Sequence, residues 1–203
     1  MSNDSLAIIF VSNGPGELAT WVKPLAQELH KQIALNPKVS SSSISLNLVL
    51  VPCPNANGYE HIAAKKWFQF QKIIKAKSFW KLVFKPHKFG SWPSNGLVIF
   101  LGGDQFWSVL LSARLGYLHM TYAEWIARWP FWNDRIVAMS DSIVKKLPRQ
   151  IQNRCSVIGD LTADLTETAK IDNPLPSGKW IALMPGSKST KLKIGIPFFL
   201  DVA

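Results

Sequence analysis

The feature that most constrains the fold is a pattern used twice: an apolar run, a tight glycine turn and a polar helix start. It occurs at 8–21 (IIFVSNGPGELATW) and again at 180–190 (WIALMPGSKST). A short buried strand that ends in glycine and leads into a helix is typical of nucleotide-binding α/β folds. The two segments therefore predict two related halves, with a ligand site where their strands end.

Further apolar runs extend this pattern along the chain. Strands are predicted at 6–11, 46–51, 97–101, 135–139 and 156–158, and helices at 18–33 and 106–115. Compact apolar runs that alternate with helical segments favour a parallel sheet covered on both faces. The predicted fold class is α/β: a Rossmann-like parallel sheet flanked by helices, followed by the truncated start of a second Rossmann-like domain.

A change in composition marks the predicted domain boundary. Thr, Asp, Asn, Pro, Ser and Gly dominate between 160 and 179, as in interdomain linkers. We place the first domain at 1–170, the linker at 171–178, and the first strand, loop and partial helix of a second domain at 179–203. Because one strand–helix unit buries little apolar surface, we expect it to pack on the first domain or to belong to a longer protein.

The charge of the chain limits its partners. Its 203 residues carry 23 Lys and Arg against 13 Asp and Glu, which favours phosphate-bearing ligands, nucleic acid or an anionic membrane surface. The two cysteines and four histidines have no metal-ligand or disulfide-framework spacing. We find no bilayer-spanning run and no signal peptide, so we expect a cytoplasmic protein that contacts the membrane peripherally.

Two carboxylates are candidate catalytic groups. Asp104 directly follows the strand at 97–101 through two glycines, at the end of the sheet where α/β proteins place their chemistry. The competing interpretation is a helix N-cap, and both roles coexist only if one carboxylate oxygen stays free. Glu17, in the first glycine loop, would repel a phosphate but can accept sugar hydroxyls or a proton; alternatively, it only favours the helix dipole.

The two glycine loops are assigned different ligands. In the first loop, Asn13, Gly14 and Gly16 are predicted acceptor contacts. The second loop offers backbone amides, three hydroxyls and an ammonium group, which suit a nucleotide diphosphate. Its predicted nucleotide-sugar contacts are Pro185, Gly186, Ser187 and Lys188. The spacing of a P-loop NTPase is absent, and a purely structural turn remains the alternative.

The segment at 61–92 combines lysines with aromatic residues and contains no acidic residue. Its spacing predicts two short amphipathic helices that break near 77–78. A basic face opposite aromatic side chains is typical of a helix in a membrane interface. The predicted membrane contacts are Trp67, Phe70, Ile74, Phe79, Trp80 and Phe84. Alternatively, the aromatic side chains enter the core; single-stranded nucleic acid is disfavoured by the helical spacing and the missing RNA-binding motifs.

Four motifs, VSNGPGEL, GGDQFWSVLLSARLGY, VIGDLTADL and IALMPGSKSTKLKIGIPFFLDVA, together resemble lipid-A-disaccharide synthase and related GT-B glycosyltransferases. The resemblance implies an N-terminal domain that binds a lipid-linked acceptor and touches the membrane, and a C-terminal domain that holds a UDP-sugar. It places Glu17 at the family's Gly-Asp pair, Asp104 on a functionally important aspartate, and Lys188 where Arg is usual.

The sequence departs from the family at two places on the acceptor side. Asn13 replaces an acidic residue, and the segment at 122–125, with Glu124 as a further predicted acceptor contact, replaces a Ser/Pro-rich one. Both departures concern the acceptor and leave the predicted fold and donor class unchanged.

The resemblance implies a hexosyltransferase that moves a sugar from a UDP-sugar to a lipid-linked acceptor at the inner or cytoplasmic membrane. We expect no cofactor and no metal, and we expect this chain to be an incomplete part that is inactive alone. The expected partners are the UDP-sugar, the lipid-linked acceptor and an anionic membrane surface, not nucleic acid. The alternatives are a non-catalytic lipid- or nucleic-acid-binding module and a UDP-sugar epimerase relative.

Overall fold

The chain divides into two compact units, Met1–Glu167 and Thr168–Ala203. The structure, a computed structural model, describes residues 5–36, 43–53, 58–163, 165, 177–186 and 189–202.

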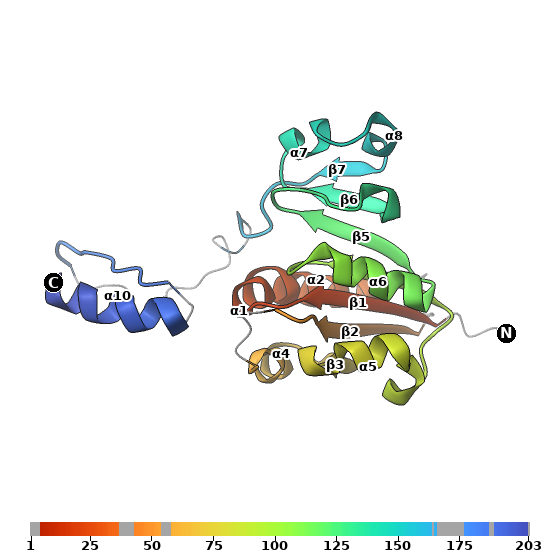
Figure 1. The fold of residues 1–203 in the computed structure, drawn as a ribbon, viewed down its shortest axis with the longest axis horizontal. Coiled ribbons are helices and arrows are strands. Elements are labelled where there is room, and N and C mark those ends of the chain that lie inside the picture. Colours follow the sequence, from red (N-terminus) through yellow and green to blue (C-terminus); the bar gives the residue numbers. More distant parts are fainter. Residues whose placement is uncertain are drawn as a thin grey trace. The chain divides into compact units, whose positions relative to one another are not determined.

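The first unit is built on a parallel sheet of seven strands in the order β3-β2-β1-β4-β5-β6-β7. The strands are β1 (Leu6–Ser12), β2 (Ile44–Leu50), β3 (Lys72–Ile74), β4 (Asn95–Phe100), β5 (Leu118–Ala123), β6 (Arg135–Ala138) and β7 (Cys155–Val157). The chain runs outward from β1 to β3 and then returns to the other side of β1, so the strand order reverses between β1 and β4 (Figure 1). The predicted Rossmann-like α/β arrangement is confirmed.

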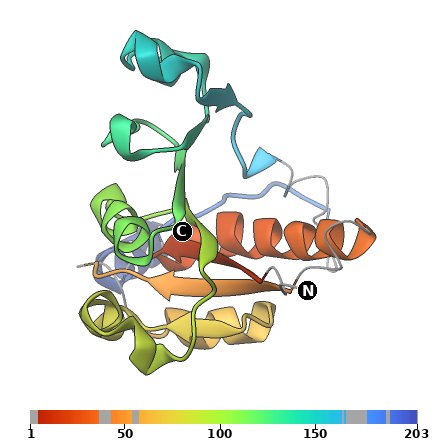
Figure 2. The same ribbon diagram turned by 90° about the vertical axis from the view of Figure 1, so that its right-hand side faces the viewer.

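Helices cover both faces of this sheet. They are α1 (Pro15–Glu17), the π-helical η1 (Leu18–Val22), α2 (Lys23–Leu35), α4 (Glu60–Trp67), α5 (Phe79–Phe84), α6 (Gln105–Leu115), α7 (Asp141–Lys145) and α8 (Arg149–Gln152). Three short 3-10 turns add η2 (Ala76–Ser78), η3 (Pro86–Phe89) and η4 (Pro130–Trp132). Figure 2 shows α7 and α8, in teal, at one end of the sheet and α4 and α5, in yellow, at the other.

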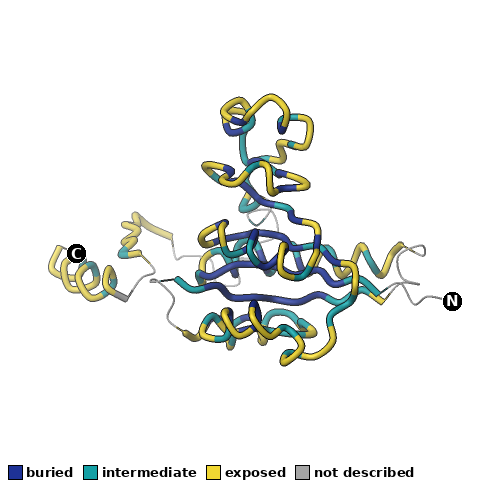
Figure 3. The backbone as a smooth tube through the Cα atoms, turned by 45° about the vertical axis from the view of Figure 1, so that its right-hand side comes forward, coloured by how far each residue is buried: buried dark blue, intermediate teal, exposed yellow. Residues whose placement is uncertain are grey.

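The core forms two apolar layers because successive residues of a strand point to opposite faces of the sheet. In β1, Ile9 and Val11 pack with α5 and α6, whereas Ile8 and Phe10 pack with η1, α2 and α4. All four side chains are buried, and Figure 3 shows the central strands as the buried layer between more exposed helices. The continuous apolar run predicted from the sequence is therefore a strand covered on both sides.

The helical run after β1 widens at η1 because of a proline. Pro24 has no N–H to donate to the carbonyl of Thr20, so the regular α-helical ladder cannot pass through this point. The chain forms the π-helical turn η1 instead, and Trp21 lies in it.

The prediction of a helix through Ile73 and Ile74 is wrong. Helix α4 ends at Trp67, and the N–H of Gln71 donates to the carbonyl of Leu46 at 2.8 Å, which brings the chain to the edge of the sheet. There Ile73 and Ile74 pair in parallel with β2. The unpaired edge of β2 offers backbone partners that an isolated helical turn lacks. The second predicted helix is present as α5.

The second unit contains the helix α10 (Ser189–Val202) and, before it, the stretch at 177–186. The strand expected at 180–184 is not formed, and among the described residues of this unit there is no strand with which it could pair. A lone strand leaves its backbone groups without ladder hydrogen bonds, which is the physical reason for the difference. The predicted linker lies mostly outside the described residues.

No helix in the described part of the chain is long and apolar enough to cross a membrane.

Candidate functional site

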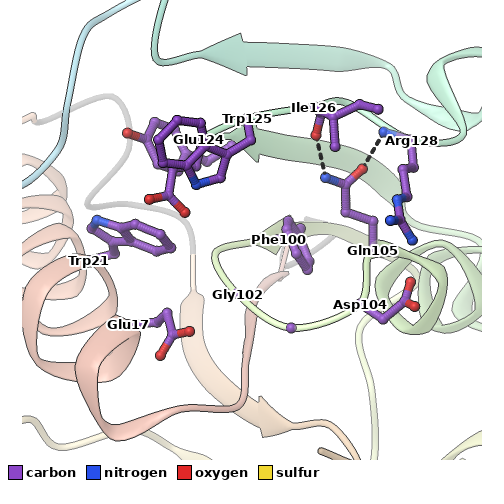
Figure 4. A pocket seen from close by; sticks show the side chains of 12 residues that line it. Glu17, Trp21, Phe100, Gly102, Asp104, Gln105, Glu124, Trp125, Ile126 and Arg128 are labelled. Carbon is purple, nitrogen blue, oxygen red and sulfur yellow. Dashed lines mark hydrogen bonds between the residues drawn. The ribbon is translucent and has the colours of Figure 1, made fainter. Parts of the chain in front are cut away.

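A pocket of about 330 Å³ opens at the carboxyl ends of β1, β4 and β5, where the strand order reverses. Its walls come from the helical run after β1, the loop after β4, the start of α6 and the segment after β5 (Figure 4). Open α/β sheets bind their ligands at this kind of reversal, outside the carboxyl ends of the strands. The pocket is therefore the candidate functional site of the first unit.

Two glycines after β4 let the two loops around the pocket pack closely. Gly103 has a φ of +96°, and a Cβ there would lie 2.8 Å from Nδ2 of Asn13. A Cβ on Gly102 would lie 3.0 Å from Cβ of Glu17. Neither position has room for a larger residue, so the glycines bring the loop of β1 against the loop of β4.

Asp104 caps α6 and still presents a carboxylate oxygen to the pocket. Its Oδ1 accepts a hydrogen bond from the backbone N–H of Phe106 at 3.0 Å. Within the described residues, Oδ2 has no hydrogen-bond partner, and Asp104 is an exposed residue of the pocket lining. The N-cap and the catalytic interpretation are thus geometrically compatible.

Glu17 lines the same pocket from α1 and is partly buried. Its carboxylate lies where a side chain on Gly14 would project, since a Cβ on Gly14 would contact this group. The two carboxylates predicted from separate glycine turns therefore line one pocket.

The predicted acceptor contacts are divided between the pocket and its surroundings. Glu124 lines the pocket, whereas Asn13, Gly14 and Gly16 do not. Asn13 is buried and packs against Gly103. Its place in the structure is to support the loop rather than to face the pocket.

The side chain of Gln105 is a feature that the sequence did not reveal. Its Nε2 donates to the carbonyl of Ile126 at 2.8 Å, and its Oε1 accepts from the N–H of Arg128 at 2.6 Å (Figure 4). The side chain is buried, so both hydrogen bonds lie in a poorly solvated place. Gln105 thus attaches the segment after β5 to the start of α6.

Tyr122 forms part of the wall and connects it to the chain after β7. Its hydroxyl donates to the carbonyl of Gly159 at 3.2 Å and accepts from the N–H of Leu161 at 3.3 Å. Burial raises the pKa of Tyr122; the nearby carboxylates of Asp160 and Glu124 raise it further, while the Leu161 hydrogen bond opposes the shift. The tyrosine is held as a neutral hydrogen-bonding group.

The pocket carries more negative than positive charge. Three carboxylates line it, those of Glu17, Asp104 and Glu124, against one guanidinium, that of Arg128. No ion pair between described residues joins Arg128 to any of them. Nor does the described part of the chain contain a group of three His, Cys, Asp or Glu side chains that could hold a metal ion.

The predicted nucleotide-sugar contacts belong to the second unit. Gly186 has a φ of +86°, in the left-handed region that glycine adopts readily. Pro185 packs against Gly195 of α10, with 3.0 Å between its Cβ and the position of a Cβ on that glycine. Ser187 and Lys188 lie outside the described residues.

The predicted membrane contacts fall into three groups. Trp80 and Phe84 are exposed on α5, and Trp67 and Phe70 are partly buried against the core. For Ile74 and Phe79 the prediction is wrong, because both are buried in the apolar layer beneath α5 and α6. Ile74 is buried because it belongs to the sheet, and Phe79 because it is on the inner side of α5.

A series of ring contacts runs from α5 across α6 to the segment after β5. Trp80 stacks on Phe84 with 5.8 Å between ring centroids. The ring centroids are 5.4 Å apart for Trp80 and Trp107, and 5.3 Å apart for Trp107 and Phe106. Phe106 then lies 6.0 Å from Trp129. We call these five residues the aromatic chain; all except the partly buried Trp107 are exposed.

In comparisons with protein families and with curated proteins, the sequence matches none.

Proposed function

We propose that this chain carries the acceptor-binding part of a GT-B glycosyltransferase that moves a sugar from a UDP-sugar to a lipid-linked acceptor at a membrane surface. The observation that carries the proposal is the pocket at the strand-order reversal, where Asp104 and Glu17 both line the wall. Carboxylates at this position can bind sugar hydroxyls and accept a proton. The resemblance to lipid-A-disaccharide synthase supplies the reaction class.

In the proposed reaction, the acceptor hydroxyl oxygen bonds to the anomeric carbon of the donor sugar. The bond between that carbon and the diphosphate oxygen breaks, and its electron pair leaves with UDP. The hydroxyl proton passes to a carboxylate, for which Asp104 is suited because its Oδ2 carries no hydrogen bond to the described residues while Oδ1 is fixed by the cap. Glu17 is the alternative base.

The second glycine turn is the proposed diphosphate site. The backbone at Gly186 and the side chains of Ser187 and Lys188 offer donors to the developing charge. Lys188 supplies a point charge in place of the bidentate fork of an arginine.

Exposed aromatic side chains beside basic residues support the proposed binding to a lipid surface. Trp80 and Phe84 share α5 and its end with the exposed Lys81 and Lys85. Aromatic burial in the headgroup region, together with attraction of lysines to anionic lipid, is how peripheral proteins hold a membrane. The same observation favours the second candidate, a lipid-surface-binding module without catalysis.

The Asp104→Asn variant tests the reaction. Because we expect the chain to be inactive alone, the variant is made in a form that carries a complete donor domain. Labelled UDP-hexoses are incubated with this protein and a membrane lipid extract, and label is counted in the organic phase. Because asparagine also caps helices, we expect the unfolding free energy to be nearly unchanged while transfer falls about 100-fold or more. Wild-type turnover in this variant would eliminate the role of Asp104.

The same assay separates the alternatives. Conversion of a UDP-sugar without lipid would identify an epimerase and contradict the proposal. If no UDP-sugar is consumed, sedimentation with anionic vesicles and binding to single-stranded RNA would distinguish a lipid-binding from a nucleic-acid-binding module.

A further inference from the structure

The walls of the pocket differ in chemistry. Figure 4 shows Glu17, Trp21, Glu124 and Trp125 on one side and Asp104, Gln105 and Arg128 on the other. We call the first group the indole wall. It combines two carboxylates with two indole rings and contains no cationic side chain.

This combination is selective for positive charge. Carboxylates attract an ammonium group and accept its hydrogen bonds, and the face of an indole ring attracts a cation through its quadrupole. A phosphate placed at the same wall would meet two like charges without a compensating cation. The indole wall therefore disfavours the phosphate-bearing ligands that the net positive charge of the whole chain suggests.

The indole wall also offers an apolar surface on which a sugar ring can pack. Trp21 is held edge to face by Tyr122, with 5.3 Å between ring centroids and an angle of 70°. The segment that carries Trp125 is held by the hydrogen bonds of Gln105 to Ile126 and Arg128. The fixed ring of Trp21 can pack on the C–H face of a saccharide, Trp125 adds a side chain that is 75% exposed, and the carboxylates accept the polar hydrogens of the sugar.

We propose that the pocket takes an amino sugar with a free, protonated amine, which the indole wall binds between Glu17 and Glu124. This names the acceptor class and rests on the proposed function only in treating the pocket as the acceptor site. Any phosphate or acyl group of the acceptor lies outside the indole wall. Arg128, on the opposite side, is the lining cation that could meet an anionic substituent.

Ligand-detected NMR titration of the whole chain tests the proposal without requiring transfer. The probes are a methyl glucosaminide, its N-acetyl form, the methyl glucoside and the acyclic amine spermidine. Because N-acetylation removes the charge and keeps the ring, we expect the free amine to bind about tenfold more tightly than the N-acetyl form. This preference should disappear when the pH rises above the pKa of the amine.

Substitution of the wall carboxylates assigns the preference. Glu124→Gln and Glu17→Gln should each reduce the preference about threefold or more, with binding of the uncharged glucoside changed less than about twofold. Glu28→Gln is the matched control, since Glu28 is an exposed carboxylate of the same unit that pairs with Lys31 outside the pocket. It should leave the preference intact.

The binding preferences and the transfer assay together decide between the two proposals. Equal or tighter binding of the N-acetyl form would overturn the proposal, as would equal binding of an acyclic amine such as spermidine. Amine preference, together with no UDP-sugar consumption by a form that carries a complete donor domain, would keep this inference and remove the glycosyltransferase. UDP-sugar transfer to an N-acylated or phosphorylated acceptor without amine preference would do the reverse.

Discussion

The side-chain oxygen of Gln105 accepts a hydrogen bond from the backbone N–H of Arg128 at 2.6 Å, across 23 positions of the sequence. The amide nitrogen of the same side chain donates to the carbonyl of Ile126. One side chain therefore satisfies two backbone groups of the segment after β5 and fixes this segment at the pocket.

Replacing Gln105 by leucine tests this attachment. Leucine keeps an apolar bulk but leaves the Ile126 carbonyl and the Arg128 N–H without their partner, so we expect the free energy of unfolding to fall by about 2 kcal/mol. The local effect should be faster amide hydrogen exchange at Arg128. Gln32→Leu, at an exposed position of α2, is the control and should change stability by less than about 0.5 kcal/mol. Unchanged exchange at Arg128 would show that the attachment does not hold the segment.

A pair of glycines offers a second prediction. Gly103 has a φ of +96°, and a Cβ added to it would lie 2.8 Å from Nδ2 of Asn13. A Cβ added to Gly16 would meet open space. We expect Gly103→Ala to lower the free energy of unfolding by about 2 kcal/mol or more, since both backbone strain and a collision result. Gly16→Ala should be neutral or stabilise by up to about 1 kcal/mol. Urea unfolding of both variants measures the difference, and equal effects would contradict the close packing of the two loops.

The proposed lipid contact can be tested at the aromatic chain. The double variant Trp80→Ala/Phe84→Ala removes two exposed rings, and we expect binding to anionic vesicles to weaken about tenfold or more because their burial in the interface is lost. Sedimentation with vesicles measures this, and higher salt should weaken the binding of the wild-type protein. Leu35→Ala removes an equally exposed apolar side chain of α2 as the control. A similar loss in that variant would mean that the contact is not specific to the aromatic chain.

Most of the sheet could be predicted because buried parallel strands are continuous apolar runs, as in β1, β2 and β4. Strand β5 (LHMTYA) was missed because His119 and Thr121 interrupt its apolar pattern. Both side chains are nevertheless buried. The hydrogen bond that makes a buried histidine tolerable, between Nε2 of His119 and Oγ of Ser108, depends on the tertiary structure.

The parts of the site that lie at strand ends could be predicted from the sequence. The parts that depend on how loops pack together could not. Asp104 and Glu17 are predicted from glycine turns that mark the carboxyl ends of β4 and β1, and both line the pocket. The pairing of Gln105 with Arg128 is not predicted, because a glutamine after a helix cap has no preferred partner in the sequence. The amphipathic pattern at 61–92 misled for Ile74, since helical spacing cannot distinguish a membrane-facing side chain from one in an edge strand that completes a sheet.

The stability of the protein should depend on pH through the buried His119. His119 is buried, its Nε2 lies 2.9 Å from Oγ of Ser108, and burial lowers its pKa from 6.5 to about 4, although a backbone contact with Trp132 and the charge of Asp134 oppose the shift. Between these values the unfolded chain binds a proton that the folded protein does not. The free energy of unfolding should therefore fall as the pH is lowered from 6.5 to about 4, by roughly 3 kcal/mol. Urea unfolding at several pH values across this range measures the change in the free energy of unfolding.

Two variants test the assignment to His119. His119→Gln, which can keep a hydrogen bond to Ser108 without titrating, should flatten the dependence of stability on pH. His87→Gln, at an exposed position, should leave this dependence unchanged. An equally steep curve in the His119 variant would assign the pH dependence to other groups.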